Sequence, residues 1–96
     1  FQKKGDYLLF ELKDMTKLHG MSILSGTNKY EYPQDLQIQT SLNGIDWEIL
    51  PLTYQTQSDY AFKPADVLFI KLILAQDSKK NAWTVNNVMF HLASNQ

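Results

Sequence analysis

Two polar stretches of the sequence, residues 26–34 and 76–83, combine aromatic rings with amide and charged side chains. A flat aromatic ring can stack on the apolar face of a pyranose sugar, while planar polar groups hydrogen-bond its hydroxyls. Both stretches are rich in turn-forming residues, so we expect them to be surface loops. We predict that these loops form a ligand-binding site. Its candidate residues are Asn28, Tyr30, Tyr32, Lys80, Asn81 and Trp83.

The residue types that catalyse reactions occur singly in this chain. Asp46 and Glu48 alternate along a strand, which indicates a solvent-facing surface rather than two carboxylates opposed across a cleft. His19 and His91 are far apart and no cysteine accompanies them, which argues against a metal site. No serine lies in a nucleophile elbow, and no glycine-rich phosphate loop is present. We expect a chain that is not an enzyme and that holds no metal or other cofactor.

Length and composition predict one globular domain. The chain has 96 residues, of which 44% are hydrophobic, so residues 1–96 form a single unit with a modest core. The net charge is −1 and no basic patch is present, which argues against a nucleic-acid partner. Neither polar loop carries an apolar pair at its tip, which disfavours insertion into a membrane. Because the chain begins at Phe1 rather than at Met, we expect a fragment of a larger multidomain protein.

The strongest local signal is a β-hairpin over residues 36–50, LQIQTSLNGIDWEIL. Asn43 and Gly44 separate two alternating apolar runs and favour a two-residue type I′ turn. That turn pairs Thr40 with Trp47 and places both on the apolar face. A slip of one residue would turn Trp47 outward, so the pattern predicts that Trp47 lies in the core.

Alternation predicts further strands and one irregularity. Residues 13–16 are polar and are expected to form a turn. In the strand that follows, a bulge at Gly20 would bring Leu18, Met21 and Ile23 to one side. Several short strands with turn signals between them and no helical period indicate an all-β antiparallel sandwich or barrel. The predicted strands outside the hairpin are 6–12, 17–25, 60–63, 66–75 and 85–92.

The strand at 66–75 is apolar on both faces apart from Lys71. This pattern is typical of a central strand that is covered on both sides. Lys71 is expected to extend towards solvent or to pair with a carboxylate rather than to contact a ligand.

Several stretches match one domain family in the right order. They are QKKGDYLLFEL at 2–12, LHGMSIL at 18–24, YP at 32–33 with SLNGIDW at 41–47, FKP at 62–64 with FIKL at 69–72, and WTVNNV at 83–88. Together they resemble the discoidin domain, also called the coagulation factor V/VIII type C domain, and its relatives the family 32 carbohydrate-binding modules. The resemblance implies an antiparallel jelly-roll β-sandwich like that of galactose-binding domains.

The resemblance also bears on individual residues. In sugar-binding members of the family an aromatic residue near the position of Trp83 often stacks on the ligand, while in many relatives it closes the end of the core, and both readings stay open. Tyr32 precedes Pro33 and resembles a framework position. The family has a structural calcium site, but Asn87 stands where its glutamate would be, and the N-terminal segment that completes that site is missing from residues 1–96.

These expectations converge on a binding module. The resemblance implies a non-catalytic, glycan-targeting domain, attached to a larger bacterial carbohydrate-active enzyme or surface protein. Its partner would be a glycan or cell-surface carbohydrate, and its location extracellular or at the cell surface. The alternative is a protein-interaction, adhesion or purely architectural β-sandwich.

Overall fold

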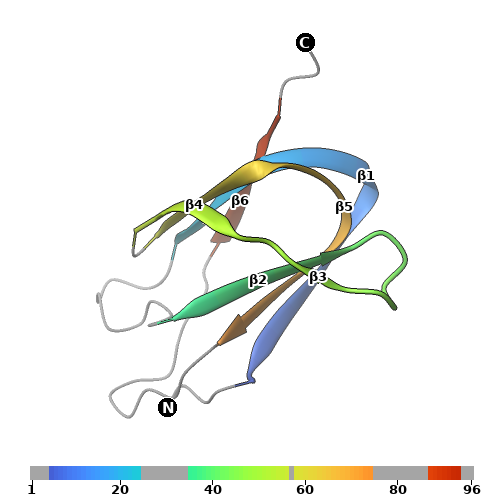
Figure 1. Cartoon of the computed structure of the whole chain (residues 1–96), viewed down its shortest axis with the longest axis horizontal. Coiled ribbons are helices and arrows are strands. Elements are labelled where there is room, and N and C mark those ends of the chain that lie inside the picture. Colours follow the sequence, from blue (N-terminus) through green and yellow to red (C-terminus); the bar gives the residue numbers. More distant parts are fainter. Residues whose placement is uncertain (1–4, 25–34, 57, 75–86, 94–96) are drawn as a thin grey trace.

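The computed structural model describes residues 5–24, 35–56, 58–74 and 87–93 (Figure 1). The described residues form strands and connections but no helix, so they include none that could cross a membrane. This confirms the all-β prediction. The strands are β1 (Tyr7–Leu24), β2 (Leu36–Ser41), β3 (Glu48–Ile49), β4 (Leu52–Gln55), β5 (Asp59–Leu74) and β6 (Asn87–Leu92).

Two long strands, β1 and β5, organise the sheet. The strand order is β3-β2-β5-β1-β6, with β4 paired to β5 off this path, and every pairing is antiparallel. Residues 7–11 of β1 and 69–74 of β5 join β2 and β3 in what we call the first half of the sheet. Residues 20–24 of β1 and 59–62 of β5 join β4 and β6 in the second half. Both long strands curve between the two halves (Figure 1).

The polar segment 13–16 does not end the first strand, so the predicted turn is wrong. Strand β1 continues through it, but its register with β5 shifts between Glu11 and Thr16. Four residues of β1 lie between these positions, against one residue of β5 between Phe69 and Val67. Three of these four residues, Lys13, Asp14 and Met15, are exposed. A polar insertion therefore bends a continuous strand instead of reversing it.

The predicted bulge at Gly20 is confirmed. The register of β1 shifts between Leu18 and Gly20 against both β5 and β6. Leu18, Met21 and Ile23 are all buried, as the change of phase in the sequence required. A Cβ atom at Gly20 would lie 2.6 Å from the backbone oxygen of Tyr60, so the close approach of the strands needs glycine here.

Strand β5 replaces two predicted strands, 60–63 and 66–75, with one. It passes through Pro64, which the sequence pattern would place at a strand end. Pro64 lies between Ala61 and Ala65, where β5 has three residues opposite the single residue between Leu18 and Gly20 of β1. The missing N–H of proline therefore falls at a bulge, where the ladder is already interrupted.

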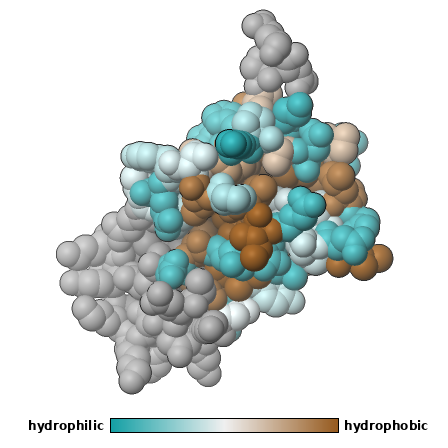
Figure 2. Space-filling view, in the orientation of Figure 1, coloured by the Kyte–Doolittle hydropathy of each residue, from teal (hydrophilic) through white to brown (hydrophobic). Residues whose placement is uncertain are grey.

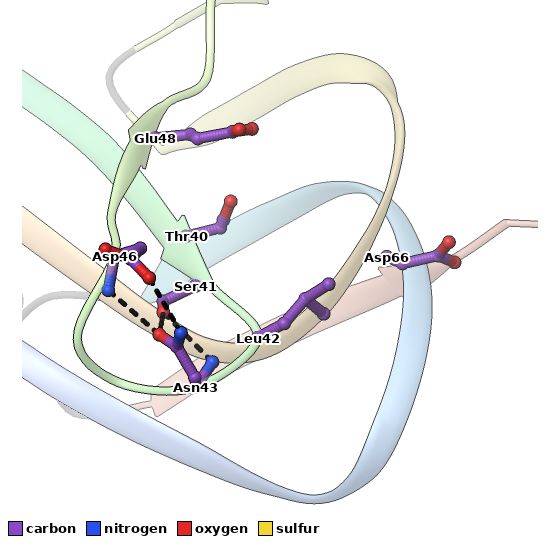
Figure 3. Close-up of a pocket in the computed structure, with 7 residues that line it drawn as sticks. All are labelled: Thr40, Ser41, Leu42, Asn43, Asp46, Glu48 and Asp66. Atoms are coloured by element: carbon purple, nitrogen blue, oxygen red, sulfur yellow. Dashed lines mark hydrogen bonds between the residues drawn. The ribbon is translucent and has the colours of Figure 1, made fainter.

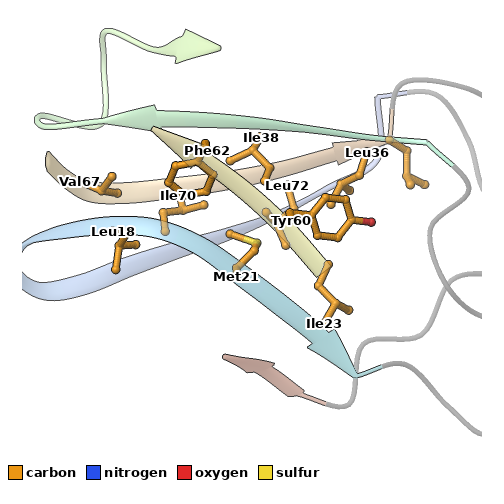
Figure 4. Packing of buried hydrophobic residues seen from close by; sticks show 11 residues of the cluster. Leu18, Met21, Ile23, Leu36, Ile38, Tyr60, Phe62, Val67, Ile70 and Leu72 are labelled. Carbon is orange, nitrogen blue, oxygen red and sulfur yellow. The ribbon is translucent and has the colours of Figure 1, made fainter. Parts of the chain in front are cut away.

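The core lies between the two halves of the sheet. Apolar side chains from both halves meet there (Figure 4). Strand β5 contributes core residues from its beginning, such as Tyr60, and from its end, such as Leu72. Phe10 of the first half packs edge-on against Phe90 of β6, with ring centroids 5.7 Å apart. The architecture is therefore β-sandwich-like; the jelly-roll connectivity stays a prediction. The buried hydrophobic residues are Leu18, Met21, Ile23, Leu36, Ile38, Tyr60, Phe62, Val67, Ile70, Leu72 and Leu74.

The hairpin of β2 and β3 forms, but its predicted register is wrong by one residue. Thr40 pairs with Glu48 instead of Trp47. Leu50 takes the inward position expected for Ile49, donates its N–H to the carbonyl of Ile38 at 2.9 Å and packs against the core. Because the side-chain period of a strand is two, this shift turns Trp47 and Ile49 to the outer side of the sheet.

Candidate functional site

The six residues predicted to bind ligand lie outside the described residues. This applies to Asn28, Tyr30 and Tyr32 of the first loop and to Lys80, Asn81 and Trp83 of the second. Their role stays a prediction. The described residues direct attention to a different surface, the outer side of the first half of the sheet.

Two cross-strand rows of side chains build this surface. In one row, Lys71 of β5 lies between Leu9 of β1 and Gln39 of β2. Gln39 in turn pairs with Ile49 of β3. Their inward neighbours, such as Ile38, Ile70 and Leu72, form the core, so alternation sends these residues to the outside.

The neighbouring row runs from Tyr7 of β1 through Ile73 of β5 to Gln37 of β2. A third row joins Glu11 to Phe69 and Ser41. We call the surface formed by the outward members of these rows, together with Trp47, the aromatic face. It consists of Tyr7, Leu9, Glu11, Gln37, Gln39, Trp47, Ile49, Phe69, Lys71 and Ile73.

The side chain of Lys71 connects two aromatic rings that come from opposite sides of β5. Its Nζ atom lies 4.2 Å from the centre of the Trp47 ring and 5.1 Å from the centre of the Tyr7 ring. Both distances are within the range of cation–π attraction. Lys71 was expected either to extend towards solvent or to pair with a carboxylate. No carboxylate among the described residues forms an ion pair with it, and its ammonium group lies over two rings instead.

Trp47 is half-buried on the aromatic face, which corrects its predicted place in the core. Its ring meets that of Phe69 edge-on, with 6.4 Å between the centroids. Phe69 also packs close to Gly44, where a Cβ atom would lie 3.3 Å from the ring. Trp47 is therefore held at the margin of the sheet by one ring and one ammonium group.

The loop that carries Trp47 is fixed by its own side chains. Asn43 Oδ1 accepts hydrogen bonds from the N–H groups of Ile45 and Asp46, both at 2.8 Å. Ser41 Oγ accepts from the N–H groups of Asn43 at 3.2 Å and Gly44 at 2.8 Å. These bonds replace the two-residue turn with a wider loop in which only Gly44 has a positive φ, of 77°.

The aromatic face leaves substantial apolar area in contact with solvent. Tyr7 is 56% exposed, Leu9 52% and Ile49 58%. Figure 2 shows hydrophobic side chains gathered among hydrophilic ones on the visible side of the molecule, where β2 and β3 lie in Figure 1. Scattered exposed apolar residues are ordinary, but a contiguous set around two aromatic rings is typical of a binding surface.

A cavity of about 250 Å³ lies beside the loop that joins β2 to β3 (Figure 3). It is lined by Thr40, Ser41, Leu42, Asn43, Asp46, Glu48 and Asp66. Asp46 is held by Asn43 Nδ2, which donates to its Oδ2 at 2.9 Å, while Asp66 lies apart from the loop in Figure 3. Within the described ranges, no three His, Cys, Asp or Glu side chains are placed to hold a metal ion.

Serine, histidine and aspartate side chains meet at a third place, in the second half of the sheet. Ser22 Oγ donates to Asp59 Oδ1 at 2.5 Å and lies 2.8 Å from His91 Nε2. A hydroxyl has one proton, so with that proton given to Asp59 the contact with His91 requires Nε2–H to be the donor. His91 in this state cannot accept the Ser22 proton, so the group ties β1, β5 and β6 together rather than activating a nucleophile.

His91 has a second neighbour, His19, whose ring stacks on it with 6.0 Å between the centroids. A cavity of about 300 Å³ opens nearby and is lined by Ser22, Ile23, Leu24, Ser58, Asn87 and Met89. Asn87 is exposed at the start of β6.

Sequence reasoning missed the aromatic face, although one signal for it was present. Tyr7 and Leu9 share the outward phase of β1, and Lys71 interrupts the same phase of β5. These residues come together only through the pairing of strands that are distant in sequence. Trp47 joins them because the hairpin register is shifted by one residue.

Comparison of the sequence with protein-family models finds no match, and a search among curated proteins finds no match either.

Proposed function

We propose that this chain is a non-catalytic glycan-binding module and that the aromatic face is a binding surface for sugar residues. The observation that carries the proposal is that the Trp47 and Tyr7 rings lie on the same sheet surface as the Gln37 and Gln39 amides. Aromatic rings cover the apolar C–H face of a pyranose, and amides pair with its hydroxyls. Side chains on paired strands supply these groups in a fixed arrangement.

The two amides are already oriented relative to each other. Gln39 Nε2 donates to Gln37 Oε1 at 2.8 Å, and both side chains are half-buried. This leaves the carbonyl oxygen of Gln39 to accept and the amino group of Gln37 to donate a hydrogen bond to a ligand. A pair that offers both roles suits hydroxyl groups, which donate and accept.

The biological role that follows is targeting. A module of this kind, in a discoidin-like jelly-roll fold, would hold an attached bacterial enzyme or surface protein against extracellular or cell-surface carbohydrate. Weak binding suffices, because tethering raises the local concentration of the attached domain. The loop residues Asn28, Tyr30, Tyr32, Lys80, Asn81 and Trp83 remain candidates for a second contact region of the same module.

A glycan array with variants tests the proposal. The chain has two tryptophans, so Trp83→Phe leaves Trp47 as the only indole, and its emission should change when a bound glycan is added. Trp47→Ala should abolish array binding if the aromatic face is the site, whereas Trp83→Ala should do so if the loops are. Tyr54→Ala is the matched control, because Tyr54 is an exposed tyrosine on β4, outside the aromatic face.

A second candidate function is protein interaction, which the exposed aliphatic side chains of Leu9 and Ile49 favour. Aliphatic groups beside aromatic rings are typical of the central part of a protein interface. Absence of binding to every glycan on the array, by a folded wild-type chain, would reject the glycan proposal and leave this one.

A further inference from the structure

We propose that the glycan bound on the aromatic face is acidic and that Lys71 binds its carboxylate. This inference rests on the proposed function and narrows it to one class of ligand, polymers that contain uronic acids. The structural basis is the position of one ammonium group in the middle of a surface that is otherwise aromatic, aliphatic and amide.

Lys71 lies at the centre of the aromatic face. Leu9 and Gln39, its direct cross-strand neighbours, are uncharged. Its Nζ atom lies over the Trp47 and Tyr7 rings, and the residue as a whole is half-buried. Contact with ring faces leaves N–H donors of the ammonium group free to point at a ligand. A carboxylate is the group that uses both its charge and its donors.

The rings and the cation also suit one ligand together. Lys71 Nζ lies over one face of each ring, 4.2 Å from the centre of the Trp47 ring and 5.1 Å from that of the Tyr7 ring. A sugar ring would therefore stack on the opposite face of one ring, from where a carboxylate substituent could reach past the ring edge to the ammonium. The Gln37 and Gln39 amides lie on the neighbouring strand, where they can bond the hydroxyls of the same ligand. A neutral sugar would use the rings and amides but would offer the ammonium only hydroxyl oxygens, without an opposite charge.

The carboxylate of Glu11 allows the charge of the ligand to be tested. It is the one carboxylate among the described residues of the aromatic face, and it lies opposite Phe69, diagonal to Lys71. It is exposed, and the structure shows no ion pair between it and Lys71. Glu11 should therefore repel an acidic glycan and have little influence on a neutral one.

The experiment compares each acidic polymer with its own methyl ester, which keeps the sugar backbone and removes the negative charge. Polygalacturonate, alginate and hyaluronan are the probes, and binding to the wild-type chain is measured at low and at high salt. At least one acidic polymer should bind about ten-fold more tightly than its ester, and the preference should shrink as salt rises.

Three variants assign the preference to Lys71. Lys71→Gln should reduce the affinity for the acidic polymer to that of the ester, and Lys71→Arg should restore a preference. Glu11→Gln should tighten binding of the acidic polymer and leave the ester unchanged. Thermal melting of each variant verifies that the fold is kept, so a lost preference in a folded Lys71→Gln chain reports on the ligand contact.

The outcomes separate this inference from the function on which it rests. Equal binding of the acid and its ester, or a preference that persists in Lys71→Gln, overturns the acidic-ligand inference while glycan binding stands. Binding of no glycan at all overturns both. A protein partner would instead appear as self-association or capture that depends on Leu9 and Ile49 and is indifferent to Lys71→Gln.

Discussion

Ser22 Oγ lies 2.8 Å from His91 Nε2 and links two strands whose residues here are 69 positions apart in the sequence. The same hydroxyl donates to Asp59 on β5. One small side chain therefore connects β1 to both of its neighbours in the second half of the sheet.

Replacing Ser22 with alanine should lower the free energy of unfolding by about 1–2 kcal/mol, because the half-buried His91 and the Asp59 carboxylate both lose a partner. Urea unfolding followed by circular dichroism measures the change. Ser22→Thr keeps the hydroxyl and serves as the control. A Ser22→Ala midpoint equal to that of the wild type would show that water replaces the hydroxyl at no cost.

Replacing Gly20 with alanine should destabilise the chain by roughly 1–3 kcal/mol, since its Cβ would lie 2.6 Å from the carbonyl oxygen of Tyr60. His91 is the nearest side chain, with Cδ2 at 3.6 Å. Adding His91→Ala to Gly20→Ala should not restore stability, because the blocking atom belongs to the backbone. Recovery in the double variant, measured by thermal melting against each single variant, would contradict this explanation.

Replacing Asn43 with alanine should cost about 1–2 kcal/mol, since the loop N–H groups of Ile45 and Asp46 lose their acceptor. Asn43→Asp retains an acceptor oxygen but puts a second carboxylate beside Asp46. Its stability should therefore lie between that of the wild type and that of Asn43→Ala. Denaturant unfolding gives the order of stability. The environment of Trp47 should change in the same variants, and an unchanged indole emission in Asn43→Ala would indicate that the loop does not position the ring.

The stability of the chain should fall at alkaline pH because of Tyr60. Burial, with smaller contributions from the carboxylates of Asp35 and Asp59, raises the pKa of Tyr60 from 10.0 to about 12. Between these values the unfolded chain has released the phenol proton and the folded chain has kept it, so stability decreases as pH rises. The decrease is about 1.4 kcal/mol for each pH unit in that window.

Tyr60→Phe has no phenol proton and is the control for this pH dependence. Its unfolding free energy should decline less steeply than that of the wild type from pH 10 to pH 12. The measurement is urea unfolding at several pH values, with the other tyrosines and lysines common to both chains. Parallel declines in the two chains would assign the alkaline loss to other groups.

The sequence was informative where a local pattern decides the structure. Leu18 is out of phase with Met21 and Ile23, and only an extra residue near Gly20 can bury all three, so the bulge was predictable from spacing alone. The absence of a helical period likewise predicted an all-β chain. These features depend on alternation, which tertiary pairing did not override.

The hairpin shows where local pattern fails. A type I′ turn needs positive φ at both central residues, and here only Gly44 has it. The Asn43 side chain bonds the loop backbone instead, which lengthens the connection and moves Trp47 outwards. Asn-Gly fits either outcome, because asparagine can form a tight turn or cap a wider loop with its side chain.

For a similar reason, the sequence predicts strand ends where β1 and β5 only bend. Residues 13–16 and Pro64 are turn signals, and the sequence cannot distinguish a turn from a bulge in a long strand. The aromatic face depended on that distinction, since Tyr7 and Lys71 meet only through the β1–β5 register. The sequence shows the types of the side chains, but which of them become neighbours is decided by the pairing of distant segments.

Because β1 and β5 run through both halves of the sheet, unfolding of either strand removes pairings from both halves. Loss of structure should be all-or-none, and formation should be slow for a chain of this size, since most pairings join distant segments. A molecule captured on the aromatic face of the first half would, by mass action, also slow amide hydrogen exchange in β6, which it never touches. Binding at one surface would thus reduce the opening of strands on the other side of the core.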